Sequence, residues 1–371
     1  FEDYGLFTQV EQLNKTALKA HGLDKSGHLY KVNNFDFHRY EDAIKLADDP
    51  DYNQASFEGM LEIKGDSDHT KLIEMLDALN DESQKIDDVL GTYFDTENLV
   101  YWLAFQILTG NCDTQNRNCY LYSPLNSKVW YFLDWDNDGM LRKLELSLTG
   151  FSDYASWERG ASNYWGNVLF NRVLRSKSFR SELDRAVKDL RSYMTEARLS
   201  KMVKHYREVT ESLVFASPDI DNLPVTKDQY EQIAAAIPSE IEENYKSFRE
   251  SFKKPMPFYI GVPQIDNGKL RMNWDASYDF EARDIRYTVE LARDYAISDV
   301  VFKAEDVLLP EVTCDAPDTG QYFVRVRATN SDGYTQDAFD YYVTDDGKHY
   351  GMKCFYVQDG GKVVEDTYEE G

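Results

Sequence analysis

The chain has 371 residues, 42% of them hydrophobic, and its 66 acidic residues outnumber its 41 basic residues to give a formal net charge of −25. This composition suffices for ordinary hydrophobic cores, and the length predicts two or three domains. Nucleic acid is excluded as a partner because a surface of this charge repels phosphates, and no apolar run approaches the ~20 residues of a membrane span. The electrostatic field of such an acidic surface attracts basic proteins and divalent cations, although the charge can also serve only to keep the protein soluble.

The first 110 residues are predicted to combine polar loops with helices. Residues 4–10 have the composition of a strand. The apolar residues between Leu72 and Leu79 recur on one face of a helix. Asp95 precedes an apolar run from Leu99 to Leu108, which is typical of a capped, buried helix that ends at Gly110.

A short β-hairpin is predicted after this helix. Residues 111–118 form a polar loop, and residues 119–123 and 129–133 are both β-prone, with a turn at 124–128 between them. The second strand leads directly into an acidic cluster, Asp134 to Asp138. The hairpin would therefore present carboxylates at its open end.

The remainder of the chain changes from helical to β-type patterns. Residues 163–252 are predicted to be helical, and residues 253–257, with two lysines and two prolines, mark a domain boundary. Beyond it, apolar residues alternate with polar ones, as in Leu270, Met272, Trp274, Tyr287, Val289, Leu291, Tyr322, Val324 and Val326. We therefore predict one domain over 1–254 and an antiparallel sandwich with a C-terminal β extension over 255–371.

The polar loop contains a candidate catalytic pair. Asp113 and Asn118 stand five residues apart, as do the catalytic Asp and the metal-binding Asn of protein kinases. One tight loop can then aim both side chains at a single phosphate, where Asp accepts a hydroxyl hydrogen bond and Asn offers an oxygen to Mg²⁺. Asp136, on the predicted hairpin, would supply a second metal ligand. The alternative is a polar loop whose side chains satisfy turn backbone groups.

The acidic cluster also permits a calcium site. Asp134, Asp136, Asp138, Gly139 and Glu145 match the EF-hand loop pattern residue for residue. Such a loop binds Ca²⁺ through oxygens at its first, third, fifth and twelfth positions. An EF-hand loop is entered from a helix, however, whereas the preceding segment is β-prone and aromatic. Both interpretations require a hard cation.

Several separate motifs, in the same order, resemble the CotH family of spore-coat-protein kinases and their secreted relatives. They are the segment from Gly110 to Tyr122, the segment from Trp135 to Asp138, and the segments from Tyr4 to Glu11 and from Gly27 to Lys31. The last two are similar to that family's entry into the hinge. The resemblance covers roughly residues 1–250.

The resemblance implies an α+β protein-kinase-like lobe, mainly helical with a short hairpin at the site. It further implies a bacterial enzyme that uses ATP and Mg²⁺, with Mn²⁺ as a substitute, to phosphorylate Ser in secreted, cell-surface or spore-coat proteins, often basic and repetitive ones. Carried over residue by residue, Asp113 would be the catalytic base. Asn118 and Asp136 would be metal ligands, Asp138 a supporting carboxylate in the metal site, and Glu11 a hinge residue near the nucleotide.

The chain also departs from the family pattern. Asp134 replaces the Pro that commonly precedes the Trp-Asp pair, so no role transfers to it. The chain begins with Phe1 and contains no signal peptide, phosphate-covering Gly-rich loop or nucleotide-binding strand Lys that we recognise. We therefore expect it to start inside a longer precursor and to be an incomplete kinase as given. A non-catalytic surface adhesion protein built on the same lobe is the alternative.

The C-terminal region resembles a different family. Trp274, Tyr287 and the segment from Gly320 to Gly333 look like strands B, C and F of a fibronectin type III domain. That resemblance implies a spacer or a protein-binding module. Its aromatic residues are expected to belong to the sandwich core.

The four cysteines fall into two sets. Cys112 with Cys119 and Cys314 with Cys354 each lie within one predicted domain, which suits an oxidising compartment, although the number would also suit a cytosolic protein. We predict a disulfide between Cys314 and Cys354, which would close a loop of about 40 residues and contribute roughly 3–4 kcal/mol. Two separate buried thiols are the alternative. Whether Cys112 and Cys119 are bonded stays open.

Overall fold

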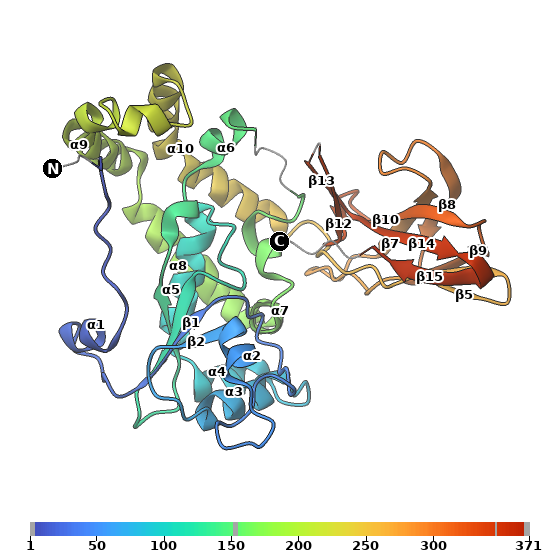
Figure 1. Cartoon of the computed structure of the whole chain (residues 1–371), viewed down its shortest axis with the longest axis horizontal. Coiled ribbons are helices and arrows are strands. Elements are labelled where there is room, and N and C mark those ends of the chain that lie inside the picture. The colour runs from blue at the N-terminus through green and yellow to red at the C-terminus, as the bar shows by residue number, and fades with distance from the viewer. Residues whose placement is uncertain (1–3, 151–154, 346, 367–371) are drawn as a thin grey trace. The chain divides into compact units, whose positions relative to one another are not determined.

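The computed structural model describes residues 4–150, 155–345 and 347–366, and the chain divides into two compact units (Figure 1). Unit 1 comprises Phe1–Ser152 and Tyr164–Lys246, and unit 2 comprises Asp153–Asn163 and Ser247–Gly371. The sequence pattern placed the division near residue 254. In the structure, the segment 153–163 and the last residues of the longest helix belong to unit 2.

Unit 1 is mostly helical, as its sequence predicts. The helices of the chain are α1 (Lys15–Ala20), α2 (Gln54–Met60), α3 (Thr70–Asn80), α4 (Ile86–Tyr93), α5 (Thr96–Thr109), α6 (Lys143–Leu148), α7 (Val168–Arg175), α8 (Lys177–Tyr193), α9 (Glu196–Val214) and α10 (Lys227–Ser251), with 3-10 turns η1 (Asn137–Gly139), η2 (Gly160–Tyr164), η3 (Asp219–Asn222) and η4 (Asp359–Gly361). No helix in the described part of the chain is long and apolar enough to cross a membrane.

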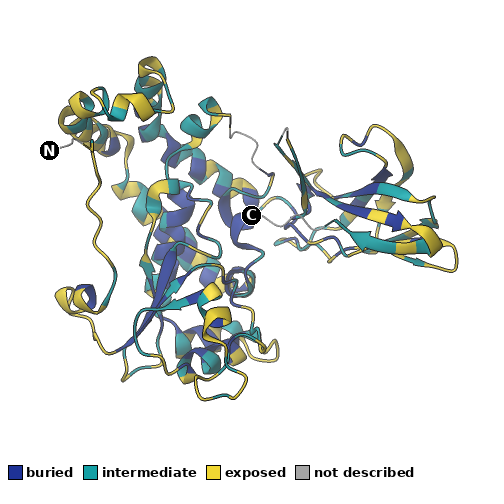
Figure 2. Ribbon diagram, viewed as in Figure 1, coloured by how far each residue is buried: buried dark blue, intermediate teal, exposed yellow. Residues whose placement is uncertain are grey.

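Helix α5 forms the centre of unit 1 and has the predicted caps. The Asp95 carboxylate accepts a hydrogen bond from the backbone N–H of Asn98 at 2.9 Å. Gly110 ends the helix at φ 67°, a left-handed conformation that glycine adopts without strain. Figure 2 shows the buried centre of unit 1 beside the largely exposed α9 and N-terminal segment. The capped helix predicted from Asp95 to Gly110 is thus confirmed.

A four-stranded antiparallel sheet lies beside α5. Its strands are β1 (His28–Val32), β2 (Leu61–Ile63), β3 (Cys119–Ser123) and β4 (Tyr131–Asp134), in the order β2-β1-β3-β4. The β3–β4 hairpin is the predicted one, and Cys119 pairs with Asp134 at its open end. The strand predicted at residues 4–10 is wrong: these residues join no sheet, and the Phe7 side chain is 76% exposed.

A buried imidazole, His69, is held between aromatic side chains in this sheet region. The Tyr30 hydroxyl lies 2.9 Å from its Nδ1 and the Tyr52 hydroxyl 3.2 Å from its Nε2. The ring also stacks on Phe57, with 4.0 Å between ring centroids. Burial lowers the pKa of His69 to about 4, because the charged ring would lose its hydration.

This pKa predicts a pH-dependent stability. The unfolded chain protonates His69 below its ordinary pKa of 6.5, while the folded chain keeps it neutral down to about 4. His69 therefore contributes its full stabilisation above pH 6.5, and this contribution is lost as the pH falls. At pH 4.5 the protonation of this group in the unfolded chain lowers the free energy of unfolding by about 2.5 kcal/mol. Urea unfolding gives the free energy of unfolding at pH 7 and at pH 4.5. The decrease between these two pH values should be smaller by that amount in His69→Phe than in the wild type. Equal losses in both proteins would refute this role of His69.

Unit 2 is β-rich, with antiparallel sheets. Its strands are β5 (Gln264–Asp266), β6 (Lys269–Asn273), β7 (Ile285–Ala292), β8 (Val300–Val307), β9 (Glu311–Asp315), β10 (Gly320–Asn330), β11 (Thr335–Asp337), β12 (Tyr341–Thr344), β13 (Gly347–Tyr350), β14 (Met352–Gln358) and β15 (Lys362–Glu365). One sheet has the order β15-β14-β10-β7-β8 with β11 added to β10, a second is β5-β6-β9, and a third is the β12–β13 hairpin. Strands of the first two sheets share one core, which includes Met272, Val289, Val324 and Phe355.

The predicted disulfide between Cys314 and Cys354 is not formed, since all four cysteines are free thiols. Cys314, on β9, packs against the core shared by the two sheets. Cys354 belongs to a separate cluster with Phe323, its partner across β10 and β14. Neighbouring residues of a strand point to opposite faces, and Phe355 already faces the shared core, so Cys354 faces away from Cys314.

Candidate functional site

The candidate catalytic loop, residues 111–118, begins on a rigid support. The backbone N–H of Asn111 donates to the Gln106 carbonyl at 3.1 Å, and the Asn111 side-chain amide donates to Gln106 Oε1 at 3.1 Å. The Thr114 hydroxyl donates back to the Asn111 carbonyl at 3.2 Å. These bonds fasten the loop to the end of α5, so its geometry follows from that helix.

Asp113 and Asn118 meet in this loop, as their spacing predicts. The Asn118 amide nitrogen donates to Asp113 Oδ2 at 2.8 Å. Asn118 has φ 58°, a left-handed conformation that Asn tolerates better than most residues. The Arg117 guanidinium lies 3.4 Å from Asp113 Oδ1. Because the nitrogen of the Asn118 amide makes the internal contact, its oxygen is the atom that can serve a cation.

The hairpin brings the acidic cluster to this loop. Since Cys119 pairs with Asp134, Asn118 and Trp135 leave the two strands at the same end of the sheet. Trp135 packs edge-on against Tyr120, with 5.4 Å between ring centroids. Asp136 follows at φ 56°, another left-handed residue, and η1 begins directly after it. The chain thus turns sharply where the carboxylates are presented.

The electrostatics of Asp113 reflect this neighbourhood. Desolvation by burial is the largest influence on Asp113 and raises its pKa. The positive charge of Arg117 and the hydrogen bond from Asn118 lower this pKa, whereas the negative charges of Asp138 and Asp136 raise it. The net shift of the Asp113 pKa is upward. A carboxylate with a raised pKa accepts a proton more readily than an ordinary one. The same coupling places the charges of Asp136 and Asp138 within interaction range of Asp113.

Gln106 connects the loop to the hairpin, a role that no motif in the sequence predicts. It lies buried in α5, and its side-chain N–H donates to Asp134 Oδ1 at 2.9 Å and to Asn137 Oδ1 at 3.3 Å. A Cβ on Gly139 would lie 2.6 Å from Asn111 Oδ1, so the two segments are in close contact. The one sequence feature that could have indicated this role is the polar side chain of Gln106 within an otherwise apolar helical run. Asp134 is therefore held by the scaffold.

The acidic loop does not adopt the helix–loop–helix form of an EF-hand. It is entered from strand β4, and both carboxylate oxygens of Glu145 are bound by the Arg142 guanidinium, at 2.8 and 2.9 Å. Within residues 4–150, 155–345 and 347–366, no three His, Cys, Asp or Glu side chains are grouped so that they could hold a metal. A cation at Asp136 and Asp138 would therefore need further oxygen donors.

Glu11 lies outside this cluster of contacts. It is exposed, precedes α1, and forms an ion pair with His21 at 2.8 Å. No contact in the described part of the chain joins it to Asp113 or Asn118. Its role near a nucleotide stays a prediction.

The comparison with protein families agrees with the motifs of the loop and hairpin. A family model described as CotH kinase protein matches residues 2–248, which is more than half of the chain and includes Asp113, Asn118 and Asp136. No curated protein matches the chain. On the strength of the family match, the chain belongs to the CotH kinase family.

Proposed function

We propose that this protein is an ATP- and Mg²⁺-dependent phosphotransferase that phosphorylates Ser in secreted, cell-surface or spore-coat proteins. The observation that carries the proposal is the 2.8 Å hydrogen bond between Asn118 and Asp113 on a loop that adjoins the acidic end of a hairpin. Membership of the CotH kinase family supports the same reaction class. A base and cation ligands on adjacent segments are the parts that phosphoryl transfer requires.

The donor atoms at the site fit Mg²⁺. The carboxylate of Asp136 and the amide oxygen of Asn118 are hard ligands, and Asp138 adds a nearby negative charge. Mg²⁺ usually binds one or two carboxylates together with substrate phosphates, so the phosphates of ATP would complete the set of ligands that Asn118 and Asp136 would supply. When bound, the ion would neutralise charge on the phosphates of ATP.

Asp113 would act as the general base. Its carboxylate accepts the proton of the serine hydroxyl as the serine oxygen bonds to the γ-phosphorus of ATP. The bond between that phosphorus and its bridging oxygen breaks, and the bond's electron pair leaves with ADP. Asn118 holds the Asp113 carboxylate in place through its amide N–H, and Asp113 later releases its proton to solvent.

The charge of the chain favours a basic acceptor. With a formal net charge of −25, the surface attracts positively charged segments and slows the approach of acidic ones. We therefore propose that acceptor serines lie among Lys and Arg residues. This preference should weaken as salt is added, because screening shortens the reach of the field.

The full-length protein, incubated with Mg²⁺ and ATP labelled at the γ-phosphate, tests the function. We expect phosphoserine on a Lys-rich serine peptide, less on a Glu-rich peptide of the same length, and none after chelation of the cation. Mass spectrometry identifies the modified residue. Absence of transfer to protein or peptide with both Mg²⁺ and Mn²⁺ would contradict the proposal.

For unit 2 we propose a fibronectin type III-like sandwich. The support is the order of its strands: β5-β6-β9 forms one sheet and β8-β7-β10-β14 lies consecutively in the other, around a shared core that contains Trp274 and Tyr287. Strands β11, β12 and β13 are inserted between β10 and β14. An aligned packing of two such sheets is typical of this class of domain.

A further inference from the structure

Helix α9, in unit 1, has an apolar stripe on its solvent side. Met202, Tyr206, Val209 and Leu213 recur at intervals of four, three and four residues, the spacing that places side chains on one face of a helix. Their side chains are between 45% and 62% exposed. Within α9, all of which the structure describes, Leu199 alone is buried. Single exposed apolar residues are ordinary on a protein surface, whereas a contiguous stripe of them is typical of an interaction surface.

A groove of about 810 Å³ lies beside this stripe, at the corner where α8 ends and α9 begins. Met202 and Tyr206 belong to both the stripe and the lining of the groove. The lining also includes the cationic side chains of Arg198 and Lys201 and the imidazole of His205, which has an N–H donor in either tautomer. No Asp or Glu among the described residues lines this groove. It therefore offers apolar surface next to positive charge.

One wall of the groove is a preformed pair of side chains, Arg198 and Tyr193. The guanidinium carbon of Arg198 lies 3.6 Å from the centroid of the Tyr193 ring, and its Nη2 donates to the Tyr193 hydroxyl at 2.6 Å. The backbone N–H of Arg198 donates to the hydroxyl of Thr195, the N-cap of α9, at 3.3 Å. A guanidinium has five N–H donors in one plane. The bond to Tyr193 therefore orients Arg198 and leaves other donors for a carboxylate, which arginine can bind through two parallel hydrogen bonds.

The cations of the groove have no acidic partner, unlike a neighbouring lysine on the same helix. Lys204 Nζ lies 3.8 Å from Glu208 Oε1, one turn further along α9. In the described ranges 4–150, 155–345 and 347–366, no Asp or Glu lies within ion-pair distance of Arg198 or Lys201. Their charge is therefore not neutralised within the chain.

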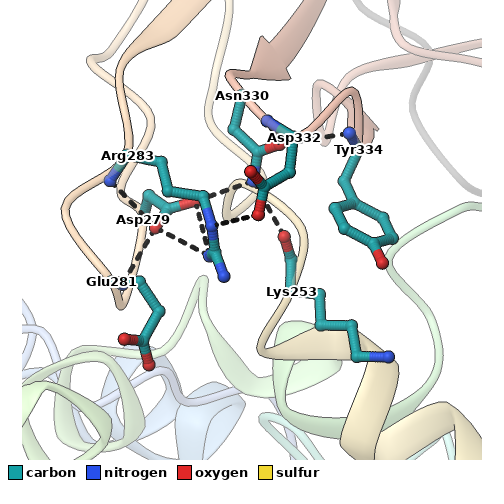
Figure 3. Close-up of polar contacts among 7 residues, drawn as sticks. All are labelled: Lys253, Asp279, Glu281, Arg283, Asn330, Asp332 and Tyr334. Atoms are coloured by element: carbon teal, nitrogen blue, oxygen red, sulfur yellow. Dashed lines mark hydrogen bonds and ion pairs between the residues drawn. The ribbon is translucent and has the colours of Figure 1, made fainter.

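An arginine with a structural role has a different environment, as a buried network within unit 2 shows (Figure 3). The Arg283 guanidinium lies 3.2 Å from Asp279 Oδ1 and 2.7 Å from Asp332 Oδ2, and the side chain of Asp279 is 1% exposed. Asp279 Oδ2 also accepts a hydrogen bond from the Asn330 side-chain amide at 2.9 Å. Such a network uses its charges to stabilise itself. Arg198, exposed and without a carboxylate, can use its charge for a ligand.

We propose that the groove and the stripe together bind a partner protein through a segment that combines Asp and Glu with apolar residues. The carboxylates of the segment accept hydrogen bonds from Arg198 and Lys201, and its apolar side chains cover Met202 and Tyr206. Tyr and Met are enriched in protein interfaces, and the flexible Met side chain adapts to its partner. The inference does not rest on the proposed function, since none of these residues belongs to the candidate catalytic loop or its hairpin.

The net charge of −25 does not oppose this choice of partner at close range. At physiological ionic strength, interactions between exposed charges are largely screened beyond about 8 Å. The charges nearest to a bound segment therefore decide its affinity, and in the groove these are positive. The net charge slows the approach of an acidic partner but does not cancel these contacts.

Fluorescence anisotropy with the full-length protein tests the site. The probe is a labelled peptide of Asp and Glu with Leu or Phe at every third or fourth position, and a matched peptide has Asn and Gln in place of Asp and Glu. We expect saturable binding of the acidic peptide and about tenfold weaker binding of the neutral one, because several exposed ion pairs of modest strength are lost. Absence of saturable binding, or equal affinity for the two peptides, would overturn the proposal.

The variant Lys201→Glu has a matched control in Lys204→Glu. The two variants make the same change of charge at exposed positions three residues apart on one helix, but only Lys201 lines the groove. Lys201→Glu should weaken binding of the acidic peptide about five- to tenfold, and Lys204→Glu less than about twofold. Equal losses would show that only net charge matters and would overturn the site.

Two further measurements separate the apolar contribution and a second copy of the chain. Met202→Gln should weaken both peptides about threefold, because it removes apolar contact and no charge; unchanged affinity would exclude the stripe from the binding surface. Sedimentation of the protein without peptide should show no dimer that Lys201→Glu disrupts. Such a dimer would assign the groove to a second copy of the chain and overturn the proposed partner.

Discussion

Replacement of Asp113 by Asn is expected to lower the turnover of the full-length protein by roughly 10²–10⁴-fold, the usual contribution of a general base. The amide keeps the shape of the side chain and can still contact Asn118, but it cannot accept the hydroxyl proton. The KM for ATP should change little, because Asp113 is assigned to the acceptor serine. Initial rates of phosphate transfer at saturating Mg²⁺ measure the effect.

The control for this substitution is Asp48→Asn, which removes the same charge from an exposed position outside the candidate site. It should keep wild-type turnover. If Asp113→Asn also retained wild-type turnover, Asp113 would not be the base. A loss of the same size in both variants would assign the effect to net charge.

Replacement of Gly65 by Ala is expected to have the largest effect on stability. A Cβ at this position would lie 2.5 Å from both the Gly27 carbonyl oxygen and the Leu29 nitrogen. Both atoms belong to the backbone at the start of β1, and Gly65 itself donates to the Leu29 carbonyl at 3.0 Å. The clash can be relieved only by moving the strand, so we expect a loss of roughly 2–4 kcal/mol in the free energy of unfolding.

The chain offers a matched control in Gly91, within helix α4. A Cβ there meets no atom within 4 Å, and Ala is favoured over Gly in a helix interior by about 0.5–1 kcal/mol. Urea unfolding should therefore shift in opposite directions for Gly65→Ala and Gly91→Ala. Wild-type stability of Gly65→Ala would show that the close approach at β1 is not a constraint.

Elements with signals in their own residues were predictable from the sequence. Helix α5 has a capping Asp95 and a terminating Gly110 around an apolar run, and the β3–β4 hairpin has two β-prone segments around a turn. The strand predicted at residues 4–10 failed because a strand also needs a neighbour to bond its backbone. Its composition alone cannot supply that neighbour.

The candidate site was predictable where one loop forms it. Asp113 and Asn118 meet because they stand five positions apart in one tight loop, and their contact depends on little else. Gln106 and Tyr164 could not be found in this way. Gln106 occupies an apolar helical run. Tyr164, whose hydroxyl lies 2.9 Å from the Thr114 hydroxyl, comes from a segment about fifty residues away that has no motif.

The predicted disulfide shows a different limit of sequence patterns. The spacing of Cys314 and Cys354 suited a crosslink, but it did not specify the face of the sheet to which each cysteine belongs. In a strand, a shift of one residue reverses that face. Cys354 lies opposite Phe323 in the register of β10 and β14, in a cluster apart from the core that Cys314 joins.

The position of Mn²⁺ in crystals soaked with the ion and a non-hydrolysable ATP analogue, located by anomalous scattering, tests the central claim most directly. We expect the ion to lie about 2.0–2.6 Å from oxygens of Asn118 and Asp136, with the γ-phosphate of the analogue on the side of Asp113. An ion bound instead by Asp134, Asp138 and Glu145 without Asn118, or a nucleotide held away from Asp113, would contradict the assignment of this loop and hairpin as the phosphotransfer site.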